Sequence, residues 1–324
     1  MRAIVNTGPG RVELKEWPLP EPAPGQVRIR TGACGLCATD LKMIDGWDRT
    51  GFPSIPGHEW AGTVEKLGSG VARELLGVRC VAENVLADGG EVGFEHPGGY
   101  GEFLVTEAAK IHVLPAGFPM AEAALIEPLA VCLRAVRRLR LEDRRSALIF
   151  GDGPIGLLML LLLRRAGVEE VCLIGGRDGR LRLAQELGAS LTLNYHALGT
   201  RLIAEVKQNV SCGFPNVVEA SGSGAALQAC LELALPCGKV LMIGDYGSAR
   251  ADFPWLHILL REIELIGSNA SAGAWPEAVH LAVERSLPLG QLISHRVAPA
   301  DFARGLELIR SHRDDVVKVV LQWQ

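Results

Sequence analysis

A glycine-rich turn constrains what this chain can fold into more than any other feature of its sequence. Gly151-Asp152-Gly153-Pro154-Ile155-Gly156 fits the pattern G-x-G-x-x-G. The apolar run 146–150 before it predicts a buried strand, and the apolar segment 157–163 after it predicts a helix. In that setting the glycines let the backbone approach a pyrophosphate, which the free N–H groups of the helix N-terminus hold. The motif therefore predicts a dinucleotide site; without that setting it would be an ordinary turn.

Strand-like and helix-like segments alternate in the later part of the chain. Further buried strands are predicted at 170–175, 216–220 and 239–244, which indicates an α/β domain with a doubly wound parallel sheet covered on both faces. Glycines and prolines recur up to about residue 101 and predict a smaller β-rich domain. A length of 324 residues exceeds what one core usually supports. We expect residues 121–289 to bind the dinucleotide, and residues 1–120, completed by a returning strand within 290–324, to form the other domain.

Charge and composition exclude several classes of protein. A formal net charge of −4 argues against a nucleic-acid binder, which needs a basic face. The longest apolar run is too short to cross a membrane, and the first residues do not resemble a signal peptide. Eight scattered cysteines are more typical of reduced thiols or metal ligands than of disulfides. We therefore expect a cytoplasmic protein that acts on a small molecule.

The end of the predicted strand 170–175 selects between the two nicotinamide cofactors. An acidic residue here usually accepts hydrogen bonds from the ribose hydroxyls of NAD, but this chain has Gly175. Arg177 can pair with a 2′-phosphate, and Arg180 can assist it. These residues favour NADP over NAD. The alternative is that both arginines are solvated and that Asp178 serves as a displaced acidic partner.

Three polar segments predict a zinc site. Cys34-Gly35-Leu36-Cys37-Ala38-Thr39-Asp40, Gly57-His58-Glu59 and Glu127-Pro128-Leu129 together offer thiolate, imidazole and carboxylate ligands. Such a set leaves one zinc position open for substrate or water. Taken singly, the two cysteines can be a redox pair, His58 an ordinary histidine and Glu127 a helix start. Their occurrence together beside a dinucleotide motif favours the metal.

With these motifs in order, nearly the whole chain resembles the medium-chain dehydrogenase/reductase superfamily, in the zinc-dependent alcohol and polyol branch that includes sorbitol and threonine dehydrogenases. Further matches are Glu186-Leu187-Gly188-Ala189 and the segment 316–321. The resemblance implies a Rossmann domain and a GroES-like catalytic domain. It also implies hydride transfer between NAD(P) and a secondary alcohol, polyol or hydroxy-amino acid, in a homodimer or homotetramer.

The resemblance also assigns roles to individual residues. Cys37 and His58 correspond to zinc ligands, while Glu59 and Glu127 compete for the third place and Glu59 also takes part in catalysis. Thr39 corresponds to the hydroxyl that relays the substrate proton. The orienting role falls to Asp40, and Cys34 becomes a structural neighbour.

Three departures from the family pattern stand out. The family's structural zinc lobe carries four clustered cysteines, whereas Cys80 is the single cysteine between residues 79 and 99 of this chain. We therefore expect one catalytic zinc and no second, structural zinc. Ala270 and Ser271 replace the arginine and tyrosine that polyol dehydrogenases carry before Trp275-Pro276. Lys42 stands where a relay histidine is common.

The rival hypotheses are a zinc-free quinone or enoyl reductase of the same fold and a non-catalytic NADP-binding protein.

Overall fold

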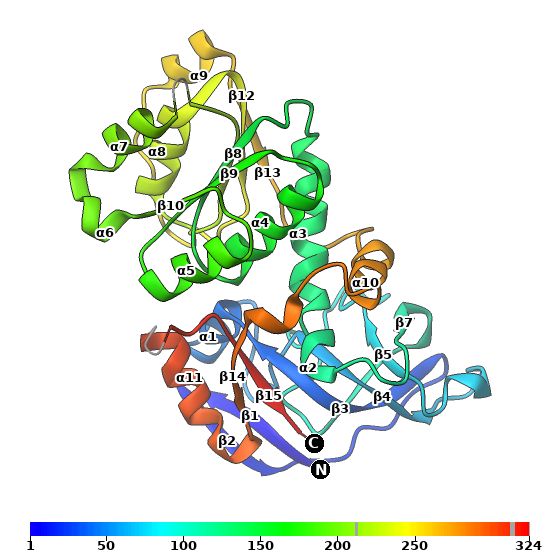
Figure 1. Cartoon of the computed structure of the whole chain (residues 1–324). Coiled ribbons are helices and arrows are strands. Elements are labelled where there is room, and N and C mark those ends of the chain that lie inside the picture. Colours follow the sequence, from blue (N-terminus) through cyan, green and yellow to red (C-terminus); the bar gives the residue numbers. More distant parts are fainter. Residues whose placement is uncertain (211–212, 312–314, 324) are drawn as a thin grey trace. The chain divides into compact units, whose positions relative to one another are not determined.

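The chain divides into two compact units in the computed structural model, which describes residues 1–210, 213–311 and 315–323. One unit comprises Met1–Glu127 and Trp275–Gln324, and the other comprises Pro128–Ala274 (Figure 1). The boundaries that the sequence predicts are 120/121 and 289/290. The later boundary differs because α10 (Trp275–Val283) packs on the first unit, where the rings of His112 and Trp275 stack with centroids 5.8 Å apart.

The first unit is built mainly of antiparallel strands. Its strands are β1 (Arg2–Gly8), β2 (Arg11–Glu16), β3 (Gln26–Leu36), β4 (Glu59–Leu67), β5 (Arg79–Ala82), β6 (Phe103–Glu107), β7 (Ile111–Val113), β14 (Ile293–Val297) and β15 (Lys318–Gln322). Its helices are α1 (Ala38–Ile44), α2 (Met120–Ala123), α10 and α11 (Phe302–Ser311). β1 and β2 form a hairpin, and the larger sheet has the order β14-β15-β3-β4-β5-β7, with β6 on β3.

The C-terminal strand completes this unit, as the sequence predicts. β15 pairs antiparallel with β3, with Val319 opposite Leu36 and Leu321 opposite Cys34. Val319 and Leu321 are fully buried in a core that also holds Ile29 and Tyr100. Residues at the two ends of the chain therefore share one core, and β15 brings Lys318 beside the end of β3.

The second unit is a parallel α/β sheet. Its strands are β8 (Ser146–Phe150), β9 (Glu170–Gly175), β10 (Leu191–Asn194), β11 (Phe214–Glu219), β12 (Ala234–Met242) and β13 (Glu264–Gly267). Its helices are α3 (Ile126–Leu139, which begins in the first unit), α4 (Pro154–Arg165), α5 (Asp178–Glu186), α6 (Tyr195–Leu198), α7 (Leu202–Asn209), α8 (Gly224–Leu233) and α9 (Trp255–Arg261). The strand order β10-β9-β8-β11-β12-β13 reverses direction beside β8. Ligands of doubly wound sheets bind at that reversal, beyond the carboxyl ends of the strands.

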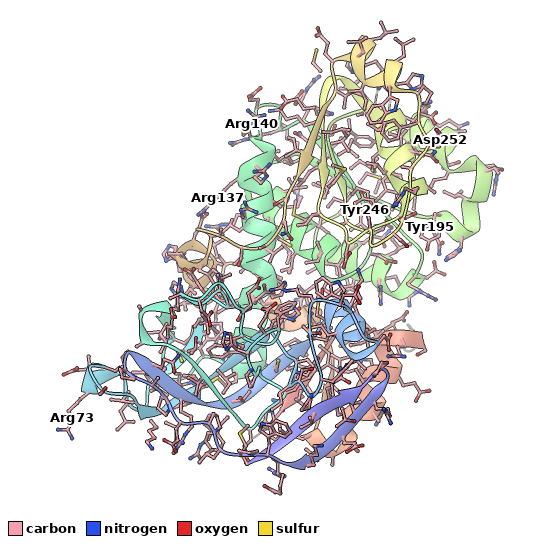
Figure 2. All side chains as sticks on the ribbon, turned by 180° about the vertical axis from the view of Figure 1, so that it is seen from behind. Arg73, Arg137, Arg140, Tyr195, Tyr246 and Asp252 are labelled. Carbon is pink, nitrogen blue, oxygen red and sulfur yellow. The ribbon has the colours of Figure 1, made fainter. Side chains whose placement is uncertain are left out.

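The two edges of this sheet are β10 and β13. β12 pairs with both β11 and β13 and is therefore internal. α3 holds the segment that contains β13, because Arg134, Arg137 and Arg138 donate to backbone carbonyls between residues 267 and 273 and Arg140 pairs with Glu264. Arg137 and Arg140 extend from this helix in Figure 2. Among the described helices, none has the length and hydropathy that a membrane crossing requires.

Candidate metal and dinucleotide sites

Cys37 lies in the turn between β3 and α1. It caps α1 with an extended backbone, and Asp40 in the first helical turn accepts a hydrogen bond from the Cys37 N–H at 2.9 Å. Thr39 is partly exposed, and its hydroxyl oxygen lies 3.7 Å from Cys37 Sγ. The cysteine therefore stands at a helix start whose geometry Asp40 fixes. Lys42 follows on the same helix.

His58 and Glu59 lie where the chain enters β4. Gly57 before them has φ +101°, and a Cβ there would lie 2.6 Å from the Tyr100 ring, so glycine is required. Asp40 Oδ1 lies 3.1 Å from His58 Nδ1, and the Tyr100 hydroxyl donates to Asp40 Oδ2 at 2.8 Å. Burial alone would lower the pKa of His58, but the carboxylate of Asp40 and the thiol of Cys37 raise it well above its usual range. Asp40 thus orients the imidazole, as the sequence predicts for it.

The structure brings Cys37, His58 and Glu59 together. One ligand atom from each lies within 4.8 Å of the others. The side chains of His58 and Glu59 are buried, and Glu59 Oε2 has no hydrogen-bond partner. A buried carboxylate oxygen without a partner is costly unless a cation or donor satisfies it. Sulfur, imidazole nitrogen and carboxylate oxygen are the ligands of catalytic zinc sites, so these residues fit the metal.

Lys318 is a charged neighbour of this cluster that sequence reasoning missed. Its Nζ lies 2.6 Å from Glu59 Oε1 and donates to Leu36 O at 3.2 Å, and both side chains of the ion pair are almost fully buried. Burial alone would lower the pKa of Lys318, but Glu59 and Cys37 raise it. A Cβ at Gly35 would lie 2.0 Å from Glu59 Oε2, so glycine leaves the room that this carboxylate occupies.

Glu127 does not join the three-residue cluster, although it lies near enough to interact with it electrostatically. Burial raises the pKa of Glu127 to about 7, while His58 opposes that shift and Glu59 adds to it. Cys34 is fully buried, and burial together with Asp40 and Glu59 raises the pKa of its thiol well above the usual range. A buried neutral thiol suits the role of structural neighbour.

The glycine turn of the second unit follows β8 and begins α4. Gly151 has φ +123°, and a Cβ at Gly156 would lie 1.9 Å from Gly151 O, so both glycines are required by the backbone itself. Gly153 caps α4 and Pro154 occupies the start of the helix. A Cβ at Gly153 would meet no protein atom within 4 Å. The helix start, with Ile155 in its first turn, is therefore open for a pyrophosphate to approach.

Asp152 shapes the neighbouring end of β9, and sequence reasoning missed this too. Its Oδ2 accepts from the N–H groups of Gly176 and Arg177 at 2.8 and 2.9 Å, and its Oδ1 lies 3.5 Å from the buried Arg180 guanidinium. A Cβ at Gly175 would lie 2.5 Å from the Asp152 side chain. The close packing of Asp152 therefore favours glycine at position 175, independently of which cofactor binds.

The two arginines of this turn lie in different surroundings. The Arg177 side chain is exposed, whereas Arg180 is buried against Asp152. The carboxylate of Asp178 accepts from Asn194 Nδ2 at 2.6 Å. The structure therefore leaves Arg177 as the accessible cation at the end of β9.

A cavity of about 510 Å³ lies at the carboxyl ends of β12 and β13. Its lining includes Arg134, Gly244, Tyr246 and Ser268, and the Ser268 hydroxyl is buried without a partner. Tyr246 is labelled in Figure 2. No sequence motif marks this cavity, because parallel pairing brings the two strand ends together.

Comparison with known proteins identifies the family. Residues 154–284 match the model of a zinc-binding dehydrogenase, and residues 23–116 match that of an alcohol dehydrogenase GroES-like domain. Human sorbitol dehydrogenase is 30% identical over 91% of this chain and 88% of its own length.

Two solved structures share the fold. A zinc-binding dehydrogenase from Sinorhizobium meliloti, bound to NADP, is 25% identical with a TM-score of 0.92 and covers 99% of this chain and 98% of its own. An alcohol dehydrogenase from Escherichia coli, complexed with NADH, is 22% identical with a TM-score of 0.93 and covers 100% of this chain and 99% of its own. The chain belongs to the zinc-dependent medium-chain dehydrogenases and is an oxidoreductase that acts on CH–OH groups with a nicotinamide cofactor.

Proposed function

We propose that this protein oxidises a polyol or another secondary alcohol, or reduces the corresponding carbonyl, with one catalytic zinc and NADP in preference to NAD. The observation that carries the proposal is the convergence of Cys37, His58 and Glu59, with a buried Glu59 oxygen left without a partner. The likeness to human sorbitol dehydrogenase supports a polyol. Hydroxy-amino acids remain within the proposed class.

In this proposal Cys37 and His58 hold the zinc, and Glu59 or Glu127 supplies the third protein ligand. Bound zinc acts as a Lewis acid that favours loss of the substrate's hydroxyl proton. Asp40 orients His58 by accepting from Nδ1, which leaves Nε2 for the metal. Because Lys318 occupies Oε1 of Glu59, Oε2 is the oxygen that remains for ligation.

Thr39 is the residue we assign to the substrate proton. Its hydroxyl oxygen lies 3.7 Å from Cys37 Sγ and can accept a proton from an alcohol bound beside that thiolate. A hydroxyl both donates and accepts, so it can pass the proton onward. Hydride transfer itself is chemistry of the nicotinamide, for which the protein supplies position and surroundings.

Cofactor choice rests on the turn after β9. Arg177 is exposed there, and Gly175 provides no carboxylate to hold a ribose hydroxyl or repel a phosphate. The charge of Asp152 is offset by Arg180 and by two backbone N–H groups. These features support NADP, and steady-state kinetics with both cofactors test the preference.

The decisive experiment combines elemental analysis with the Cys37→Ala variant. We expect one zinc per chain in active wild-type protein, and loss of both zinc and turnover in folded Cys37→Ala. A screen of alcohols, polyols and hydroxy-amino acids then identifies the substrate. Zinc-free wild-type protein that still turns over, or a fully active Cys37→Ala variant, would support a zinc-free reductase and refute the proposal. Cofactor binding without turnover on any substrate would favour the non-catalytic alternative.

We also propose a cytoplasmic homo-oligomer. The cysteines that the structure describes are thiols rather than disulfides, which suits a reducing compartment. Four large apolar side chains of α9 are exposed, and a second copy of the chain would cover them: Trp255 by 75%, Leu256 by 55%, Leu259 by 71% and Leu260 by 72%.

A further inference from the structure

Phe94 packs against the proposed zinc ligand His58. Their ring centroids lie 4.9 Å apart at an interplanar angle of 36°, and Phe94 is 9% exposed. Asp40 fixes the Nδ1 side of the same imidazole. The orientation of His58 therefore depends on a hydrogen bond and on the position of one aromatic ring.

Arg49 holds that aromatic ring in place. Its guanidinium carbon lies 4.3 Å from the centre of the Phe94 ring. Its Nε donates to Glu95 at 2.7 Å, and a terminal nitrogen donates to Glu91 at 2.7 Å and to Glu95 at 3.1 Å. Glu91 and Glu95 flank Phe94 in the chain, so a single arginine fixes the loop on both sides of the ring.

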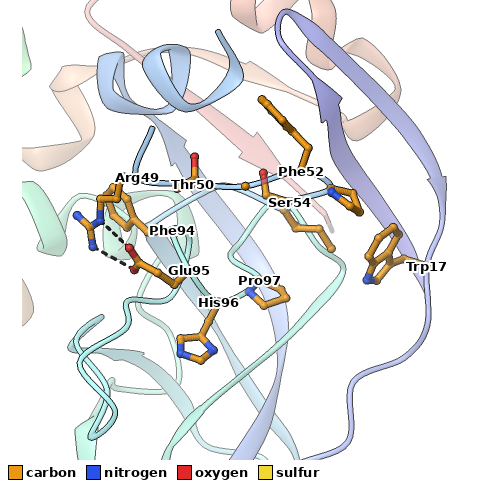
Figure 3. A pocket seen from close by; sticks show the side chains of 12 residues that line it. Trp17, Arg49, Thr50, Phe52, Ser54, Phe94, Glu95, His96 and Pro97 are labelled. Carbon is orange, nitrogen blue, oxygen red and sulfur yellow. Dashed lines mark hydrogen bonds and ion pairs between the residues drawn. The ribbon is translucent and has the colours of Figure 1, made fainter. Parts of the chain in front are cut away.

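A cavity adjoins these polar contacts. About 370 Å³ of space adjoins Arg49, Phe94 and Glu95, between the chain around residues 49–55 and the chain around 94–97 (Figure 3). Side chains that border a cavity lose the dispersion contacts that close packing would give them. The side-chain contacts of this loop include His96 Nε2 with Asp88 Oδ2 at 2.9 Å.

We propose that Arg49 is a positioning residue of the metal site, which sets the His58 imidazole through Phe94. The inference rests on the proposed function, because it takes His58 to be a zinc ligand. It assigns to an ion-pair cluster the task of holding this loop against the site. Residues that orient metal ligands typically alter metal affinity by ten- to a hundred-fold when they are replaced.

The test compares Arg49→Met with Arg49→Lys and with Arg145→Met as a matched control. Arg145 also pairs with a carboxylate through two nitrogens, but it does so with Asp143 in the other unit. We expect Arg49→Met to lower the affinity for zinc about tenfold in chelator competition and to alter the visible spectrum of the cobalt-substituted protein. The zinc affinity of Arg49→Lys should lie between those of Arg49→Met and the wild type, and Arg145→Met should bind zinc as tightly as the wild type.

The outcomes separate this inference from the proposed function. If Arg49→Met keeps the wild-type zinc affinity and cobalt spectrum, the inference is wrong, and lower stability than Arg145→Met would then show that Arg49 is merely structural. If wild-type protein binds no zinc, the proposed function itself fails. Should Arg49→Met fold poorly, Glu95→Gln probes the same contact with Arg49 retained, and unchanged zinc affinity in that variant would also overturn the inference.

Discussion

Lys318 shows how much depends on one buried charge. Because Glu59 and Lys318 are almost completely buried, Lys318→Met would leave an unpaired carboxylate in the core. Breaking a buried pair in this way typically destabilises a protein by about 3–5 kcal/mol. We expect a loss of that size in the free energy of unfolding of metal-free protein, measured with guanidinium chloride.

The double variant Lys318→Met with Glu59→Gln serves as the control for that experiment. Removing both charges avoids the unpaired carboxylate, so most of the lost stability should return. If the double variant is as unstable as Lys318→Met alone, then packing of the lysine stem, rather than its charge, is what stabilises the fold.

The sequence predicts the candidate ligands of the metal site better than it predicts the residues that hold those ligands in position. Cys37, His58 and Glu59 were proposed from motifs, and the structure places their ligand atoms together. Lys318 has a signal in the sequence, since it interrupts the apolar segment 316–321, but that pattern does not reveal which residue it meets. Tyr100 and Arg49 are joined to the site by long-range contacts that no local pattern encodes.

Among the elements, the turn from β9 to α5 carries the prediction on cofactor choice. A charge-assisted pair between Arg177 and a 2′-phosphate contributes about 1.5–3 kcal/mol, or roughly ten- to a hundred-fold in affinity. Arg177→Ala should therefore reduce the NADP over NAD ratio of kcat/KM by about that factor, mainly through KM for NADP. An unchanged ratio would show that Arg177 is only a solvated residue.

The choice of variant at this turn depends on the structure. Gly175→Asp is the substitution that the sequence suggests for reversing the preference, but its Cβ would lie 2.5 Å from the Asp152 side chain. It would disturb the turn as well as the charge. Arg182→Ala, five residues after Arg177 on α5, is the control for Arg177→Ala because it removes an arginine without touching Gly175.

Local periodicity predicted β8, β9, β11 and the second half of β12, because each contains a short apolar run. Local periodicity does not show which strand forms the sheet edge, because only the pairing of β12 with both β11 and β13 reveals that β12 is internal. The division between the units also depends on long-range contacts. α10 follows the dinucleotide-binding segment in the chain, yet Trp275 stacks on His112 of the first unit.

For the whole molecule, the open edge at β13 and the apolar face of α9 predict self-association. Within the described residues the strand order ends at β13, whose outer backbone groups can pair with a second copy. The guanidinium of Arg261, at the end of α9, donates to Leu231 O of α8 at 2.8 Å. This contact holds α9 in place with its apolar side chains exposed. Stable interfaces of this kind bury about 1,200–2,000 Å² in total.

Leu259→Glu tests that assembly. In a symmetric dimer the substitution would place a carboxylate from each copy in the apolar contact, where an unpaired charge costs several kcal/mol. We expect light scattering at micromolar concentration to show an oligomer for the wild type and a single chain for Leu259→Glu. Leu76→Glu is the matched control, because Leu76 is 57% exposed in the other unit. A monomeric wild type would refute the oligomer, while an oligomer that survives Leu259→Glu would place its interface on a surface other than α9.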